Sequence, residues 1–241
     1  MHVLILSLDT SSPSGSVAIL RDEITLGVIS TRAEENYSSR IFRHLEFLLG
    51  DLTLKLEEFD LFAVSAGPGS FTGLRVGLTA AKGWAEVYKK PVVGVSALEA
   101  VAFQTCGHVS VLVPALDARR GQIHFGVYRP AAAGLALDGE EFVVTPDEFA
   151  EKLGALGRNG GDEDNKFTIV TPDASVVAVV SRLTSNLTAS FAGLEIVSSV
   201  LAPSIGRIAH ARALRGQVSD ALTLDANYVR RTDAEMRWKD G

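Results

Sequence analysis

The chain has 241 residues, of which 46% are hydrophobic and 22% charged, and its formal net charge is −6. The single cysteine, Cys106, excludes a disulfide framework and a zinc site built on cysteines. At the level of whole-chain charge there is no basic surface of the kind that neutralises nucleic-acid phosphates. No apolar run approaches the roughly 20 residues that span a bilayer. We therefore expect a soluble cytoplasmic protein with one large or two small domains.

The first hundred residues predict an α/β unit. A nearly unbroken apolar run at 3–9 ends in a carboxylate, as is typical of a buried strand. Apolar residues between Ile41 and Leu56 recur mostly every three or four positions, which indicates an amphipathic helix. Ser96 and Glu99 have the spacing of a capping box. The remaining elements expected here are strands at 16–20, 24–31, 60–66 and 91–95, and helices ending near 89 and 104.

The order of elements then begins again. Residues 109–117 form an apolar run that ends in Leu-Asp, as the first run ends in Leu8-Asp9, and a strand at 123–127 follows. This self-similarity predicts either a true duplication of one supersecondary unit or two ordinary hairpins. Further along, the patterns predict strands at 138–145 and 167–171, helices at 146–156, 173–187 and 204–214, and a polar surface loop at 157–165. The mixture of hairpins and helices favours an α/β architecture with a mixed sheet.

A glycine-rich loop, Gly67 to Gly73, lies between a predicted strand and a predicted helix. Backbone N–H groups at a helix start can hold an anion, so the loop is a candidate phosphate site that includes Gly67 and Gly69. Its spacing matches neither a Walker A loop nor the dinucleotide fingerprint, and Pro68 stands where a nucleophile elbow needs glycine. The alternative is a tight turn in which Ser70 or Thr72 caps the next helix.

Two aspartates follow predicted strands. Asp9 with Thr10 and Ser11 can hold a magnesium ion or contact phosphate oxygens, and Asp117 with Arg119 can do the same in the second copy. The alternative is that each carboxylate caps the turn after its strand. The five histidines contain no pair at helical metal-binding spacing, and Cys106 has no evident activating partner. The sequence therefore predicts no catalytic residue and no metal site.

The helix after the glycine loop is rich in small residues, at Gly73, Gly77, Ala80, Ala81 and Gly83. Glycine inside a helix costs up to about 1 kcal/mol relative to alanine, so this pattern needs a physical reason. The reason we expect is close approach of another helix or strand. That neighbour belongs either to the same chain or to a partner.

Several stretches together resemble the bacterial TsaB (YeaZ) family. They are Leu8-Asp9-Thr10-Ser11, the loop from Ala66 to Gly77, residues 91–98, Leu116-Asp117-Ala118-Arg119 and the tail Tyr228-Val229-Arg230. The likeness is strong over about residues 3–130 and weak from about 131 to 225. The segment Gly-Pro-Gly-Ser-Phe-Thr-Gly-Leu-Arg is its most specific part.

The resemblance implies an α/β, duplicated, actin-like fold (the ASKHA or ribonuclease-H-like class) with two lobes, residues 1–105 and 106–241. It also implies a part in placing threonylcarbamoyl on N6 of the adenosine beside the anticodon of ANN-decoding tRNAs. In that family the transferase is the paralogue TsaD, which carries a His-x-x-x-His metal motif that this chain lacks. The chain is therefore expected to be a non-catalytic scaffold that activates TsaD, with the ATPase TsaE joining and tRNA contacted only indirectly. No cofactor is expected to be required, although a vestigial ATP or ADP site at Asp9, Thr10, Ser11, Gly67 and Gly69 is compatible with the resemblance.

For the scaffold, two helices of the first lobe are expected to expose one docking face. They would pack against an equivalent pair from a related chain as a four-helix bundle, or form a homodimer while the partner is absent. The residues expected on this face are Leu45, Leu48, Leu52, Gly77, Ala81 and Trp84. Two other hypotheses stay open, namely an independent ATPase, kinase or glycoprotease-like peptidase, and an actin-fold interaction module outside tRNA modification.

Overall fold

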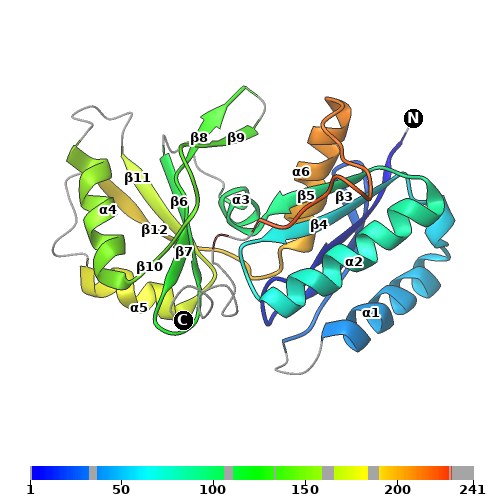
Figure 1. The fold of residues 1–241 in the computed structure, drawn as a ribbon, viewed down its shortest axis with the longest axis horizontal. Coiled ribbons are helices and arrows are strands. Elements are labelled where there is room, and N and C mark those ends of the chain that lie inside the picture. The colour runs from blue at the N-terminus through cyan, green and yellow to red at the C-terminus, as the bar shows by residue number, and fades with distance from the viewer. Residues whose placement is uncertain are drawn as a thin grey trace, which may run out of the picture.

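The computed structural model describes residues 2–32, 37–105, 111–132, 134–158, 166–183, 190–227 and 229. They form two α/β lobes side by side, each with its own sheet (Figure 1). No helix within these ranges has the length and apolar character needed to cross a membrane.

The first lobe is built on a five-stranded sheet in the order β3-β2-β1-β4-β5. Strands β1 (Leu4–Asp9), β2 (Ser16–Arg21) and β3 (Ile24–Ser30) form the predicted antiparallel meander. Strands β4 (Leu61–Gly67) and β5 (Val92–Ser96) then continue the sheet in parallel with β1. Every residue of β1 and β4 is buried, which explains their unbroken apolar runs.

Helices α1 (Tyr37–Leu52) and α2 (Phe71–Tyr88) lie over one face of this sheet (Figure 1). Their inward side chains form a core with β1, β2 and β4, whose fully buried members include Leu6, Phe62 and Leu74. Helix α1 is shorter than the pattern predicts, because Thr53 has a positive φ of 53° and ends it. A short 3-10 helix, Leu56–Glu58, follows.

The second lobe repeats the first. Its main sheet has the order β10-β7-β6-β11-β12, which matches β3-β2-β1-β4-β5 position by position, including which neighbours are parallel. This agreement confirms the duplication over the two-hairpin alternative. The strands are β6 (Val111–Asp117), β7 (Ile123–Phe125), β10 (Phe142–Val144), β11 (Phe167–Thr171) and β12 (Phe191–Ile196), with α4 (Pro146–Arg158) and α5 (Ala174–Leu183) as helices.

The third helix of each lobe packs across the junction between the lobes. Helix α6 (Ala202–Leu214) lies on the first sheet, while α3 (Ala97–Ala102) packs against β6 and α6. One core cluster therefore contains side chains from both lobes, such as Leu20, Leu98 and Ile205. The predicted division between residues 105 and 106 falls between α3 and β6, but the chain from 202 onward returns to the first sheet.

Several details differ from the predicted elements. The strand expected at 138–145 is present but shorter, as β10, and a hairpin of β8 (Tyr128–Ala131) with β9 (Gly134–Leu137) that was not predicted precedes it. Strand β12 was not predicted, because its half-exposed residues lack a clean alternation. Ser96 caps α3 as expected, but the Glu99 carboxylate pairs with Arg212 instead of completing a capping box. Most of the 157–165 loop lies outside the described residues.

Candidate functional site

The turn after β1 is organised by Asp9. One carboxylate oxygen, Oδ1, accepts hydrogen bonds from the Ser11 backbone N–H at 2.9 Å and from the Ser11 hydroxyl at 2.6 Å. The side chain has no exposed surface, and burial raises its pKa from 3.8 to about 6. The other oxygen, Oδ2, has no hydrogen-bond partner among the described residues, and neither does the buried Thr10 hydroxyl.

The second lobe has the same turn after β6. Here the Arg119 backbone N–H donates to Asp117 Oδ1 at 2.7 Å, two residues along the chain as in the first lobe. The Ser175 hydroxyl donates to the other oxygen of Asp117 at 3.1 Å. Both aspartates therefore close turns after strands, which is the alternative that the sequence left open.

The glycine-rich loop packs directly on the Asp9 turn. The Ser70 backbone N–H donates to the carbonyl oxygen of Ser11 at 2.7 Å, and the Ser70 hydroxyl caps α2 by accepting from the Gly73 N–H at 3.3 Å. A Cβ atom added at Gly69 would lie 2.4 Å from the carbonyl oxygen of Ser11. The tight-turn interpretation with Ser70 as cap is thus the observed one.

The two glycines expected in a phosphate site, Gly67 and Gly69, pack closely against other segments of the chain. Gly67 has a φ of 110°, and an added Cβ would lie 2.6 Å from the carbonyl oxygen of Asn227. The space beside Gly69 is taken by Ser11, as described above. Both glycines are required because other segments of the chain approach them closely.

The predicted docking face needs a correction. Leu45, Leu48, Gly77 and Ala81 are buried in the core under α1 and α2, while Leu52 and Trp84 are half-buried. The small residues of α2 allow it to approach the first sheet and the Asp9 turn. An added Cβ at Gly77 would lie 2.4 Å from the Thr10 hydroxyl oxygen.

The exposed side of the same two helices carries an apolar groove of about 640 Å³. Of the six residues predicted for the docking face, Trp84 lines it. Its ring and the ring of Phe42 in α1 form a T-shaped pair with centroids 6.2 Å apart. The Arg75 guanidinium lies 3.8 Å from the centre of the Phe71 ring. The lining residues are Phe42, Phe71, Thr72, Arg75, Val76, Thr79, Ala80, Gly83 and Trp84.

Sequence reasoning missed most of this groove, because it assigned the apolar stripe of α1 to the surface. Most of the stripe covers the sheet, but Phe42, which the predicted stripe included, is exposed, and so is Phe47 outside the stripe. Phe42 is 48% exposed and Phe47 64% exposed. Large aromatic side chains off the buried stripe of an amphipathic helix were the available signal. Within the described ranges, no group of three or more His, Cys, Asp or Glu side chains is placed to hold a metal ion.

Comparisons with known proteins agree with this architecture. Residues 18–218 match the family described as "TsaD: tRNA N6-adenosine threonylcarbamoyltransferase". The YeaZ structure from Pseudomonas aeruginosa superposes with a TM-score of 0.72 at 22% identity, covering 94% of this chain and 99% of that one. The chain is thus a two-lobed α/β protein with a duplicated sheet, and it belongs to the threonylcarbamoyltransferase family.

Several curated relatives share one name, tRNA threonylcarbamoyladenosine biosynthesis protein TsaB, and they identify the family more closely. The Escherichia coli protein is 31% identical over 159 residues, which cover 63% of this chain and 67% of that relative. The Haemophilus influenzae protein is 29% identical over 243 residues, covering 99% and 97%. The match to the Bacillus subtilis protein, 34% identical, spans about half of each chain, 52% and 55%. This chain belongs to the TsaB (YeaZ) family.

Proposed function

We propose that this chain is a non-catalytic subunit of the tRNA threonylcarbamoyladenosine machinery and that it acts by docking a TsaD-type transferase on the exposed face of α1 and α2. The cytoplasm is the compartment where we expect this assembly. The observation that carries the proposal is the apolar groove along the exposed side of α2, which Phe42 of α1 also lines. Contiguous exposed apolar surface of this kind is typical of interaction sites.

The family match supports a related chain as the occupant. The matched range, 18–218, includes both α1 and α2, so a transferase of this family has an equivalent pair of helices. Two such pairs can pack as a four-helix bundle, with the protruding Phe42 and Phe71 of one pair entering the groove of the other. A second copy of this chain offers the same surface, so homodimerisation competes with docking of the transferase.

The close packing of the loops around Asp9 supports a scaffold role. The residues that would form a nucleotide site, Asp9 to Ser11 with Gly67 and Gly69, contact one another or Asn227 directly. We therefore assign the chemistry to the transferase and its metal motif. The ATPase TsaE is the third component that we propose for the assembly.

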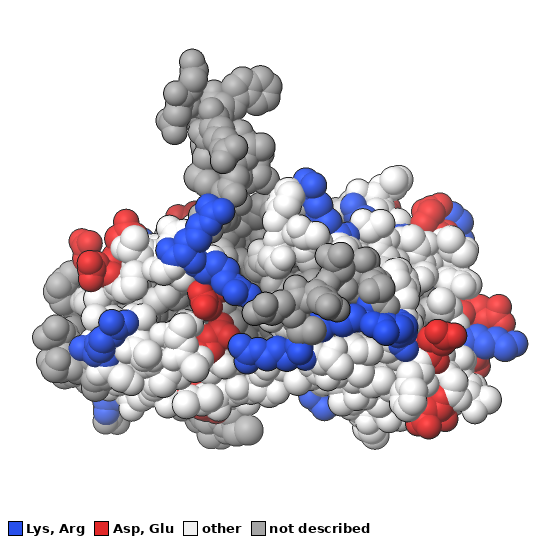
Figure 2. Space-filling model, turned by 90° about the horizontal axis from the view of Figure 1, so that it is seen from below, with Lys and Arg blue, Asp and Glu red and all other residues white. Residues whose placement is uncertain are grey.

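The charge pattern supports indirect contact with tRNA. The chain has a net charge of −6. Figure 2 shows one face of the molecule, on which basic and acidic side chains both occur and neither kind covers the surface. Phosphate neutralisation, which dominates affinity for nucleic acids, is therefore assigned mainly to the other subunits.

Two matched glycine substitutions test the docking face. Gly83 lines the groove, whereas Gly50 lies on α1 outside the groove lining, and a Cβ added at either position meets nothing within 4 Å. Gly83→Arg is expected to weaken binding to the transferase at least tenfold in a titration, which corresponds to about 1.4 kcal/mol. Gly50→Arg adds the same side chain and is expected to bind normally. Equal affinities for the two variants would refute the placement, and a wild-type chain that only self-associates would favour the homodimer.

A further inference from the structure

The end of the described chain forms a strap, residues 217–227, along the first lobe. The chain reverses direction after α6 at Gly216, whose φ is 71°. Val92 of β5 and Ser219 then exchange two backbone hydrogen bonds, of 3.0 and 2.9 Å. Further along, the side chain of Leu224 is buried in the core beneath α2. These contacts fasten a segment that comes from the second lobe to the edge of the first sheet.

The strap ends at the loop that begins α2. The Asn227 backbone N–H donates to the carbonyl oxygen of Ala66 at 2.7 Å. Its carbonyl oxygen lies against Gly67, at the start of the glycine-rich loop. Ser70, the N-cap of α2, lies three residues after Gly67. The contacts of Asn227 with Ala66 and Gly67 therefore help to fix the position of the first turn of that helix.

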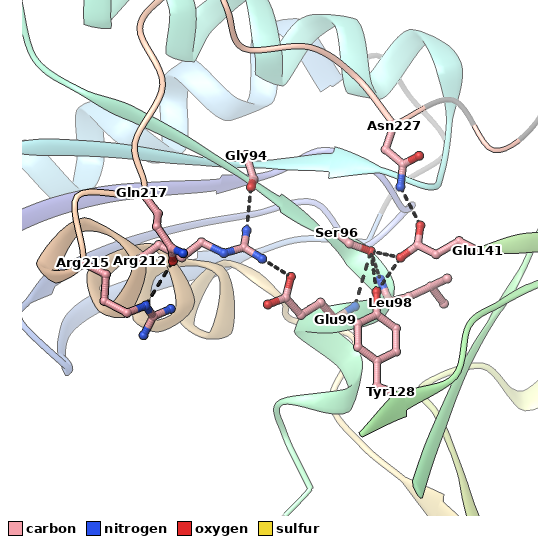
Figure 3. A network of polar contacts seen from close by, with 10 residues as sticks. All are labelled: Gly94, Ser96, Leu98, Glu99, Tyr128, Glu141, Arg212, Arg215, Gln217 and Asn227. Atoms are coloured by element: carbon pink, nitrogen blue, oxygen red, sulfur yellow. Dashed lines mark hydrogen bonds and ion pairs between the residues drawn. The ribbon is translucent and has the colours of Figure 1, made fainter. Parts of the chain in front are cut away.

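The side chain of Asn227 reaches the other lobe. Its Nδ2 donates to Glu141 Oε2 at 2.6 Å, and Glu141 lies just before β10 (Figure 3). The other oxygen of Glu141 accepts from the Tyr128 hydroxyl at 2.5 Å and from the Ser96 hydroxyl. One carboxylate thus joins the second lobe, the N-cap of α3 and the end of the strap.

We propose that the hydrogen bond between Asn227 and Glu141 is a positioning link through which the second lobe sets the first turn of α2. Three residues of that first turn and the next, Phe71, Thr72 and Arg75, line the groove. The link therefore controls the shape of the groove without touching its occupant. The expected effect of the link on affinity for the transferase rests on the proposed docking function. The expected effect of the link on the first turn of α2 does not depend on that function.

A donor–acceptor exchange provides the test. Asn227→Asp places two carboxylates face to face and is expected to break the link. Adding Glu141→Gln restores it, because the glutamine Oε1 can accept from Tyr128 and Ser96 while its amide donates to the new aspartate. The control, Thr145→Ala, removes the hydroxyl that donates to the Glu148 carboxylate and accepts from the Glu148 backbone N–H, so it lowers stability without removing a partner of the link.

The first measurement is hydrogen–deuterium exchange on each folded full-length variant. Asn227→Asp is expected to speed exchange of the Gly73 and Leu74 amides about tenfold, with the amides of α1 unchanged and the double variant restored. A wild-type rate in Asn227→Asp, or an equal acceleration in Thr145→Ala, would overturn the inference.

The second measurement is the affinity of each variant for the purified transferase. We expect a three- to tenfold loss in Asn227→Asp and recovery in the double variant. If the wild type binds and all variants bind equally, the coupling to docking is refuted. If the wild type does not bind at all, the proposed function fails, while the exchange rates still decide whether the link positions α2.

Discussion

Gly73 faces the carbonyl oxygen of Thr10 so closely that an added Cβ atom would lie 2.0 Å from that oxygen. This contact joins the start of α2 to the turn after β1. It also places a protein segment beside Asp9, the aspartate at the end of the first strand. The glycine-rich loop of this chain is therefore part of the packing of its first lobe, while the far side of α2 carries the apolar groove.

Replacing Gly73 with alanine tests this packing. Because the added methyl group collides with backbone, we expect Gly73→Ala to lower the free energy of unfolding by about 3 kcal/mol, as overpacking does elsewhere. Urea denaturation measures the change. The control is Gly83→Ala in the same helix, where nothing lies within 4 Å of the new Cβ. That variant is expected to be more stable by about 0.5–1 kcal/mol, and a similar effect of both substitutions would contradict the packing.

Asp9 predicts a specific pH dependence. Its pKa is raised from 3.8 to about 6 by burial, so the folded state binds more protons than the unfolded state between these values. The contribution of Asp9 to stability is therefore present below pH 3.8 and lost as the pH rises through about 6. Two pKa units correspond to about 3 kcal/mol. Asp9→Asn is expected to abolish this decline. Denaturation of the wild type and the variant at pH 4 and pH 7.5 measures it. The same change in the free energy of unfolding between the two pH values in both proteins would disprove it.

An ion pair between α6 and α3, in which Glu99 is buried and Arg212 half-buried, gives a third prediction. Arg212 donates to the Glu99 carboxylate at 2.6 Å and to the Gly94 carbonyl at 2.9 Å (Figure 3). Arg212→Met leaves the buried carboxylate unpaired and is expected to cost about 3 kcal/mol at pH 7.

The pH dependence of that variant separates charge from packing. Burial raises the pKa of Glu99, and removing Arg212 takes away the main opposing influence. The folded variant then binds the extra proton more readily than the unfolded chain, so its deficit is expected to shrink as the pH falls. The double variant Glu99→Gln with Arg212→Met should regain much of the stability. A deficit independent of pH would show that lost packing, and not the unpaired carboxylate, explains the effect.

Nucleotide binding gives a fourth prediction. Because Ser11 occupies the space beside Gly69, we expect ATP with Mg²⁺ to show no binding that depends on Asp9. Isothermal titration of the wild type and of Asp9→Asn measures this. Tight binding to the wild type that is lost in the variant would revive the hypothesis of an independent ATPase or kinase.

Much of the fold follows from local sequence patterns. The buried runs at β1, β4 and β6 are long and apolar, and each ends at a recognisable turn, so their positions and the duplication could be predicted. Strand β12 could not, because its side chains are only partly buried and lack period-two alternation. The crossing of α3 and α6 between lobes depends on contacts between distant segments, such as the hydrogen bond from Ser7 to the Ala202 carbonyl.

The candidate site was harder to predict for a related reason. The apolar stripe containing Leu45 and Leu48 has the spacing of a docking helix, but the same spacing serves to cover a sheet. Only the pairing of the strands shows that one face of the first sheet is apolar and must be buried by a helix. The small residues of α2 likewise face inward at Gly77, where Thr10 approaches, and outward at Gly83. A helical pattern gives the faces of a helix but not which of them meets the core.

The most direct test of the docking claim is tRNA threonylcarbamoylation reconstituted with the transferase and the ATPase. The reaction is run without this chain, with the wild type, with Gly83→Arg and with Gly50→Arg. We predict modification with the wild type and Gly50→Arg, and little or none without the chain or with Gly83→Arg. Full modification without the chain, or undiminished modification with Gly83→Arg, would contradict the account.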